Sequence, residues 1–99
     1  MQGNFQKIIQ SDIPVLIDFH ADWCQPCKVQ APILKDFVSQ MGDKVKVIKI
    51  DVDKNPGIAQ QYQIQGVPTL AIFRDGELVW RQSGVLPLEG LKQAIDPFL

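Results

Sequence analysis

Two cysteines, Cys24 and Cys27, are the residues of this chain whose type and spacing point most directly to chemistry. They lie in the stretch WCQPC at positions 23–27 and are the only cysteines among 99 residues. Two thiols separated by two residues can form a disulfide, act as a reactive dithiol or supply half of a metal site. A structural disulfide is the weakest interpretation, because so short a bridge constrains the unfolded chain little. Redox chemistry and metal binding remain.

The composition is that of an ordinary globular domain and gives no reason to expect nucleic acid or a membrane as partner. Ten basic side chains nearly balance eleven acidic ones, so neither polyanions nor anionic lipids are attracted electrostatically. The first ten residues lack the features of a secretory signal, and no apolar run approaches the roughly 20 residues that span a bilayer. We expect one cytoplasmic domain of residues 1–99, although a chain whose signal had been removed would look the same.

Apolar patterns predict the elements that position the cysteines. Asn4 can cap a short helix, and VLIDF (15–19) is typical of a strand that ends shortly before Cys24. Between residues 29 and 41, apolar side chains recur at helical spacing, and Gly42 is placed to stop that helix. The cysteines should therefore lie between the carboxyl end of a strand and the first turn of a helix.

The second half of the chain continues the alternation. VKVIKIDV (45–52) is a predicted strand, a short helix follows from Pro56, and GVPTLAIF (66–73) is another strand. The DG pair of RDGE (74–77) predicts a hairpin, and a last helix follows Pro87. The order αβαβαββα predicts a mixed sheet with helices on both faces, in which helix-connected strands run parallel and an antiparallel edge strand is added. Ligand chemistry is expected at the carboxyl ends of the parallel strands.

The predicted position of the cysteines assigns them different roles. The first turn of a helix offers unpaired N–H groups and the positive end of the helix dipole, which stabilise a thiolate. Cys24, at the open end, should be the nucleophile of low pKa. Cys27, about one turn in and more buried, should attack a mixed disulfide formed on Cys24. Pro26 suits the first turn because its missing N–H would be unpaired there. Trp23 is expected at the surface beside the sulfur, with a packing role as the alternative.

From about Phe5 to Phe98 the chain resembles the thioredoxin family. VLIDFHADWCQPCKVQAPIL, IDVDKNPGIAQQY, GVPTLAIFRDGE and the late Gly84 stand in that family's order and spacing. A CxxC pair alone is weak evidence, but WCxPC at a strand-to-helix junction, with VPT roughly forty residues later, is highly specific. The resemblance implies a thioredoxin fold, a three-layer α/β/α arrangement in which a mixed sheet is the central layer.

The resemblance also implies an activity, that of a thiol–disulfide oxidoreductase that reduces protein disulfides. Its redox-active group is the Cys24–Cys27 disulfide, and no cofactor or metal is bound. A thioredoxin reductase would reduce the oxidised pair and would use NADPH, for which this chain has no binding motif. We expect the protein to act as a monomer.

Asp18 lies in the middle of the apolar VLIDF run, on the face opposite its apolar neighbours. An unpaired carboxylate is costly there, so its pKa should rise. The resemblance implies that Asp18 lies behind Cys27 and shuttles its proton through water, with Lys49 as its charge partner. The alternative is that Asp18 and Lys49 form a tolerated buried ion pair.

Pro68 in VPT resembles the cis-proline that the family packs against its sulfurs. The backbone of Val67 beside it would then pair with an extended substrate segment, on a flat and largely apolar surface. Either glycine of that surface, Gly66 or Gly84, could equally be a turn residue. The expected substrate-binding residues are Trp23, Gln25, Pro26, Gly66, Val67, Pro68, Gly84 and Val85.

The chain departs from the family pattern at three places. Gln25 replaces the usual glycine, which puts the strength of the reductant in doubt. His20 stands where an aromatic is common, and it could tune the thiolate or simply pack. Only MQG precedes the first predicted helix, where the family has a strand. That strand is short or missing, and if it is missing VKVIKIDV becomes an exposed edge.

Three other functions fit parts of the pattern. The same fold could run in reverse as a disulfide oxidase or isomerase in an oxidising compartment. Cys24, Cys27, His20 and Asp22 could bind zinc as a mixed four-ligand site. The surface around Val67 could also bind partners without turnover, in which case serine at both cysteine positions would leave partner function intact.

Overall fold

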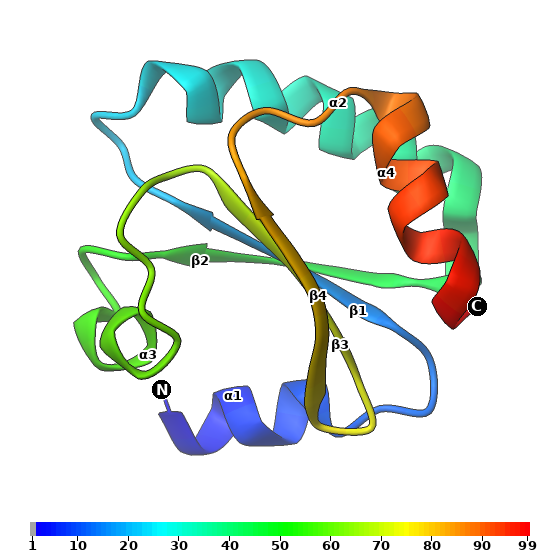
Figure 1. The fold of residues 1–99 in the computed structure, drawn as a ribbon, viewed down its shortest axis with the longest axis horizontal. Helices are drawn as coiled ribbons and strands as arrows, with labels where there is room; N and C mark the ends of the chain where they lie inside the picture. Colours follow the sequence, from blue (N-terminus) through cyan, green and yellow to red (C-terminus); the bar gives the residue numbers. More distant parts are fainter. Residues whose placement is uncertain (1) are drawn as a thin grey trace.

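The computed structural model describes residues 2–99 (Figure 1). Its elements follow in the order α1 (Gln2–Ile9), β1 (Val15–His20), α2 (Gln25–Met41), β2 (Lys46–Asp51), α3 (Pro56–Gln61), β3 (Thr69–Arg74), β4 (Glu77–Ser83) and α4 (Leu88–Ile95). Short 3-10 turns, Gly42–Lys44 and Asp96–Phe98, follow α2 and α4. The order of helices and strands predicted from the sequence is confirmed.

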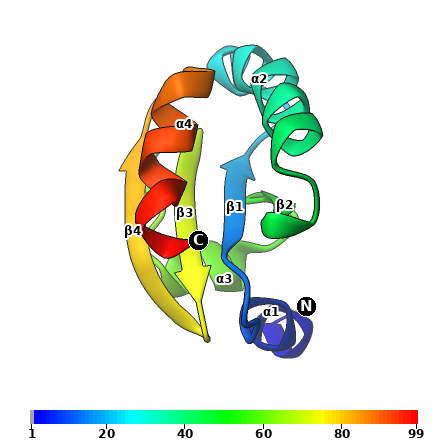
Figure 2. The ribbon, with the colours of Figure 1, turned by 90° about the vertical axis from the view of Figure 1, so that its right-hand side faces the viewer.

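The four strands form one mixed sheet in the order β2-β1-β3-β4 (Figure 2). β1 and β2 are parallel, whereas β3 is antiparallel to both β1 and β4. The expectation that all helix-connected strands run parallel is therefore wrong for β3. With six residues, α3 rises only about 9 Å, less than half the length of a strand of that size, about 20 Å. It does not return the chain to the edge where β1 begins, so β3 starts beside the end of β1.

Helices cover both faces of the sheet, which gives the predicted three layers (Figure 1). Side chains of β1 alternate between them: Val15, Ile17 and Phe19 belong to the core under α1 and α3. Leu16 belongs to the core under α2 and α4. By the same alternation Asp18 faces the α2 side. β1 is thus buried on both faces from Val15 to Phe19, and its last residue, His20, is half-buried.

The N-terminal part differs in detail from the prediction. α1 begins at Gln2, so Asn4 lies inside the helix and is not its cap. No strand precedes α1 within residues 2–99, and β2 is an outer strand of the sheet. The sequence predicted that the family's first strand is short or missing here. That strand would have to include Met1, which lies outside the described residues. Across residues 2–99, we find no helix with both the length and the apolar character that spanning a bilayer requires.

Candidate active site

The junction between β1 and α2 positions the two cysteines. β1 ends at His20, and α2 begins at Gln25 with Pro26 in its first turn. Cys24 is the N-cap residue, and its Sγ accepts a hydrogen bond from the N–H of Cys27 at 3.1 Å. The sulfur therefore satisfies one of the helix's unpaired donors and lies at the positive end of its dipole. The predicted location at a strand-to-helix junction is confirmed.

Cys24 and Cys27 are joined in a disulfide, with their Cα atoms 5.3 Å apart. Both are nearly buried, with exposed fractions of 3% and 6% respectively. The prediction that Cys27 is the more buried of the two is therefore wrong. Cys24 is covered by a distant loop, since its Sγ lies 3.4 Å from the carbonyl oxygen of Val67. What distinguishes Cys24 is its position at the helix cap, and not its exposure.

The loop before β3 borders the disulfide. Its Val67–Pro68 peptide bond is cis, as the resemblance implied. The Thr69 hydroxyl donates a hydrogen bond to the carbonyl of Gly66 at 2.6 Å, which closes the loop on itself. Gly66 has an ordinary φ and open space where a Cβ would project, so neither a turn nor a close contact requires glycine there. The loop holds the Val67 carbonyl against the Cys24 sulfur.

A second loop, after β4, is tied to the first. The N–H of Gly84 donates to the carbonyl of Pro68 at 2.8 Å. Gly84 has a φ of 95°, a conformation that favours glycine, so its role as a turn residue is confirmed. Val85 follows it and is 37% exposed. The hydrogen bond between Gly84 and Pro68 therefore places an exposed valine next to the loop that borders the disulfide.

Gln30 holds the second loop in place, a role not predicted from the sequence. Its side chain is fully buried in α2. Its Nε2 donates to the carbonyl of Leu86 at 3.0 Å, and its Oε1 accepts from the N–H of Leu86 at 2.8 Å. The available signal was its spacing, because Gln30 falls on the same side of the helix as Cys27 and Leu34, where an apolar residue would be expected.

Trp23, Gln25 and Pro26 form an exposed rim beside the disulfide, and Trp23 lines a shallow pocket together with Gly66 and Val67. Trp23 is 71% exposed, which confirms its surface position and rules out the packing alternative. Its indole Nε1–H donates to Asp53 Oδ2 at 2.8 Å, so the ring is held in place despite its exposure. Asp53 was not predicted, because the contact joins positions 30 residues apart in the sequence.

Asp18 is completely buried, and neither carboxylate oxygen has a hydrogen-bond partner among the described residues. Burial raises the pKa of Asp18, and the charges of His20 and Lys49 lower it by less. The predicted rise in pKa is confirmed. Lys49 stands opposite Asp18 in the β1–β2 register, yet its side chain is exposed. The one ion pair found across residues 2–99 joins Lys92 to Glu89, so the buried ion-pair alternative does not hold.

Beside Cys27 lies a cavity of about 210 Å³ that His20 and Lys49 also line. His20, Asp22 and Asp51 bring possible ligand atoms within 4.8 Å of one another. This group shares His20 and Asp22 with the zinc site considered from the sequence, but it contains neither cysteine. Because the cysteine sulfurs are bonded to each other, they are not available as thiolate ligands in this state.

Comparisons with known proteins agree with this geometry. The family model described as Thioredoxin matches residues 1–97. Thioredoxin 1 of Synechococcus elongatus is 44% identical over 94 residues, covering 95% of this chain and 88% of that protein. Thioredoxin of Alicyclobacillus acidocaldarius is 46% identical, covering 98% and 92%. Among solved structures, a mutant thioredoxin from Halobacterium salinarum superposes with a TM-score of 0.90 at 37% identity, covering 99% of this chain and 85% of that one.

Family, fold and site therefore point to one chemistry. The matches span nearly the whole chain, and they include the paired cysteines that the structure joins as a disulfide. That disulfide is itself the redox-active group, so the family's chemistry needs no bound cofactor. The chain belongs to the thioredoxin family and is a thiol–disulfide oxidoreductase.

Proposed function

We propose that the protein reduces disulfides of other proteins, with Cys24 as the attacking and Cys27 as the resolving residue. The Cys24 thiolate attacks one sulfur of the substrate disulfide, forms a mixed disulfide and releases the other substrate sulfur as a thiolate. The Cys27 thiolate then attacks the Cys24 sulfur, forms the Cys24–Cys27 disulfide and releases the second substrate thiolate. Two electrons pass to the substrate, whose two thiolates take up protons.

The helix cap at Cys24 is the observation that carries this assignment of roles. The Cys24 sulfur accepts the N–H of Cys27 at 3.1 Å and lies at the N-terminus of a helix of 17 residues. Both features stabilise negative charge on that sulfur, as a nucleophile or a leaving group requires. Cys27 is inside the first turn and lacks the cap position, so it is suited to the second, intramolecular step.

Asp18 and Lys49 serve the proton transfers in this proposal. A buried carboxyl group with a raised pKa can accept a proton from Cys27 and release it again closer to neutral pH than an ordinary aspartate. The open pocket of about 210 Å³ beside Cys27 gives that residue access to water, although Asp18 is not among the residues that line it. Lys49 lines that cavity and lowers the pKa of Asp18 by its charge.

Substrate docks on the exposed surface around the disulfide. An extended substrate segment pairs with the backbone of Val67, whose carbonyl is already beside the Cys24 sulfur. The two loops tied together by the Gly84–Pro68 hydrogen bond supply one side of this surface. The exposed rim of Trp23, Gln25 and Pro26 extends it, with Trp23 lining a pocket shared with Gly66 and Val67. Gly66 and Val85 complete the surface.

Regeneration and location extend the proposal beyond the site. A thioredoxin reductase that uses NADPH reduces the Cys24–Cys27 disulfide, and the protein works as an electron carrier. It acts as a monomer in the cytoplasm.

Trapping of the mixed disulfide tests the assignment. Each serine variant, Cys24→Ser and Cys27→Ser, is reduced, mixed with insulin as the disulfide substrate and analysed by intact mass. We expect Cys27→Ser to accumulate a covalent adduct and Cys24→Ser to form none. An adduct that forms on Cys24→Ser alone would reverse the roles. Turnover of insulin by the variant with serine at both positions would favour a non-covalent function.

A further inference from the structure

The outer edge of β2 carries backbone groups that no strand within residues 2–99 pairs, because β1 is its only neighbour in the sheet. The N–H of Lys46 donates to the carbonyl of Pro14 at 3.0 Å, so Lys46 faces the β1 side. Successive residues of a strand turn their N–H and C=O groups to opposite sides. Those of Val47 and Lys49 therefore point away from β1. Such an edge is a template for another strand.

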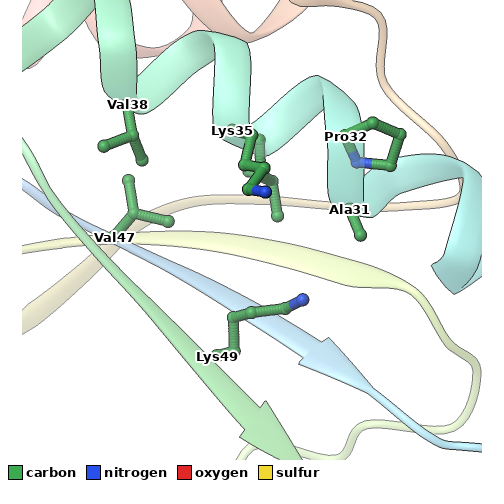
Figure 3. Close-up of a pocket in the computed structure, with 7 residues that line it drawn as sticks. Ala31, Pro32, Lys35, Val38, Val47 and Lys49 are labelled. Carbon is green, nitrogen blue, oxygen red and sulfur yellow. The ribbon is translucent and has the colours of Figure 1, made fainter.

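A groove of about 580 Å³ runs beside this edge, between α2 and β2 (Figure 3). Figure 3 shows the Val38 side chain of α2 lying over Val47 of β2. Val38 is 47% exposed and Val47 is half-buried. Because Val47 and Lys49 also point their side chains to this face, a strand paired with them would extend alternate side chains over the groove.

Two lysines from different elements give the groove its charge. Lys35 of α2 and Lys49 of β2 both line it (Figure 3). Both are exposed. Within the described residues, neither forms an ion pair. Their charges repel each other, whereas a carboxylate placed near both would be attracted by each. The groove therefore combines an apolar part at Val38 and Val47 with a basic part at Lys35 and Lys49.

A second copy of this chain is a poor occupant of the edge. Two β2 strands paired with Lys49 opposite Lys49 of the other copy would bring like charges together, which is destabilising. A register with Lys49 opposite Asp51 would instead use a carboxylate that already accepts the N–H groups of Asp53 and Lys54. Lysine on an edge strand is a common means of preventing such self-pairing. A strand that places its acidic side chains beside Lys35 and Lys49 meets attraction there instead.

We propose that the β2 edge and its groove bind an extended segment of a partner protein in which apolar and acidic residues alternate along one face. Its backbone pairs with Val47 and Lys49, an apolar side chain contacts Val38, and a carboxylate lies near Lys35 and Lys49. None of the proposed substrate-binding residues lines this groove. Lys49, to which the proposed function gives a part in proton transfer, lines both the groove and the pocket beside Cys27. The contact is therefore a second interaction surface that shares Lys49 with the site, and it does not depend on the roles proposed for Cys24 and Cys27.

A synthetic peptide tests the proposal. The probe is acetyl-Thr-Glu-Thr-Val-Thr-Glu-Thr-amide, whose groove-facing order of glutamate, valine and glutamate is the same in both strand directions. It is titrated into the oxidised, nitrogen-15-labelled protein and followed by amide chemical shifts. We expect saturable shifts at Val38, Val47 and Lys49, little change at Val67, and weaker binding as salt is raised. A peptide with lysine in place of glutamate should not bind.

Two matched variants separate the groove from the rest of α2. Val38→Asp should weaken the peptide by roughly tenfold or more, because a carboxylate replaces the apolar contact and repels the glutamates. Val29→Asp is the control, since Val29 is an equally exposed valine of α2, at 51%, that does not line the groove. Lys35→Glu should also weaken binding, whereas Lys7→Glu on α1 should not. Insulin reduction at the normal rate shows that these variants are folded.

Three outcomes would overturn the proposal. The first is no saturable shift at Val47 and Lys49 up to millimolar peptide. The second is equal weakening by Val38→Asp and Val29→Asp, which would mean that binding depends on net charge alone. The third is a shift of the same amides with protein concentration in the absence of peptide, which would assign the edge to a second copy of the chain. Insulin reduction is measured separately, so none of these outcomes bears on the active site.

Discussion

Replacing Asp18 by alanine should make the protein more stable, although it removes a residue of the proposed mechanism. Asp18 is completely buried, and both of its carboxylate oxygens lack hydrogen-bond partners within the described residues. Leaving a buried polar group without a partner costs about 1–3 kcal/mol, and more if it is charged. The small cavity left by alanine costs less than about 1 kcal/mol. We expect the variant to gain about 1–2 kcal/mol in free energy of unfolding near pH 8.

The gain should depend on pH in a direction set by the raised pKa. The unfolded chain has the ordinary aspartate pKa of 3.8, and burial raises the native pKa above it. Between these two pKa values the native state holds a proton that the unfolded state has released. The stability of the natural protein therefore falls as pH rises through this window and is constant above it. The variant lacks this loss, so its advantage is largest above the window and shrinks as pH falls toward 3.8.

Guanidinium unfolding of the oxidised proteins, followed by tryptophan fluorescence at about pH 8 and about pH 4, measures both effects. Asp36→Ala serves as the control, because Asp36 is an exposed carboxylate of α2 whose removal should change stability by less than about 0.5 kcal/mol. Insulin reduction by Asp18→Ala should be slower than by the natural protein. A loss of stability near pH 8, or a gain of equal size at both pH values, would refute the reasoning.

Two further substitutions test how the loops beside the disulfide are held. Gln30→Met keeps the length of the side chain but removes both hydrogen bonds to Leu86, and it should cost about 1–3 kcal/mol in denaturant unfolding; an unchanged midpoint would show that the contact is dispensable. Gly84→Ala introduces a Cβ at a φ of 95° and should cost about 1–2 kcal/mol. Because the space around that Cβ is open, a thermal midpoint equal to that of the natural protein would show that the loop relaxes.

The parts of the site that could be predicted from the sequence depend on neighbours along the chain. The strand at Val15–His20 is indicated by an apolar run, and the start of α2 by Pro26. The position of Cys24 at a helix N-terminus follows from these two elements. The raised pKa of Asp18 was also predictable, because a carboxylate in a strand buried on both faces loses hydration whatever the rest of the fold does.

The parts that could not be predicted depend on contacts between distant segments. Cys24 is as buried as Cys27 because the Val67 loop, 43 positions away, covers it. Gln30 joins α2 to a residue 56 positions away, which nothing in its local sequence specifies. The direction of β3 depends on where a short helix returns the chain, and not on the pattern of β3 itself. Local patterns therefore give the elements, and long-range packing decides how they enclose the site.

The equilibrium reduction potential of the Cys24–Cys27 pair tests the central claim most directly, namely that the protein is a reductant of protein disulfides. It is measured by thiol counting in defined redox buffers. The account predicts about −270 mV, the value known for thioredoxin, which lies below a cytosolic glutathione poise of roughly −220 to −260 mV. A value above about −200 mV, toward disulfide isomerases and oxidases, would contradict the account. Electron flow would then run in the opposite direction, and Gln25 and His20 would be the first residues to examine as its cause.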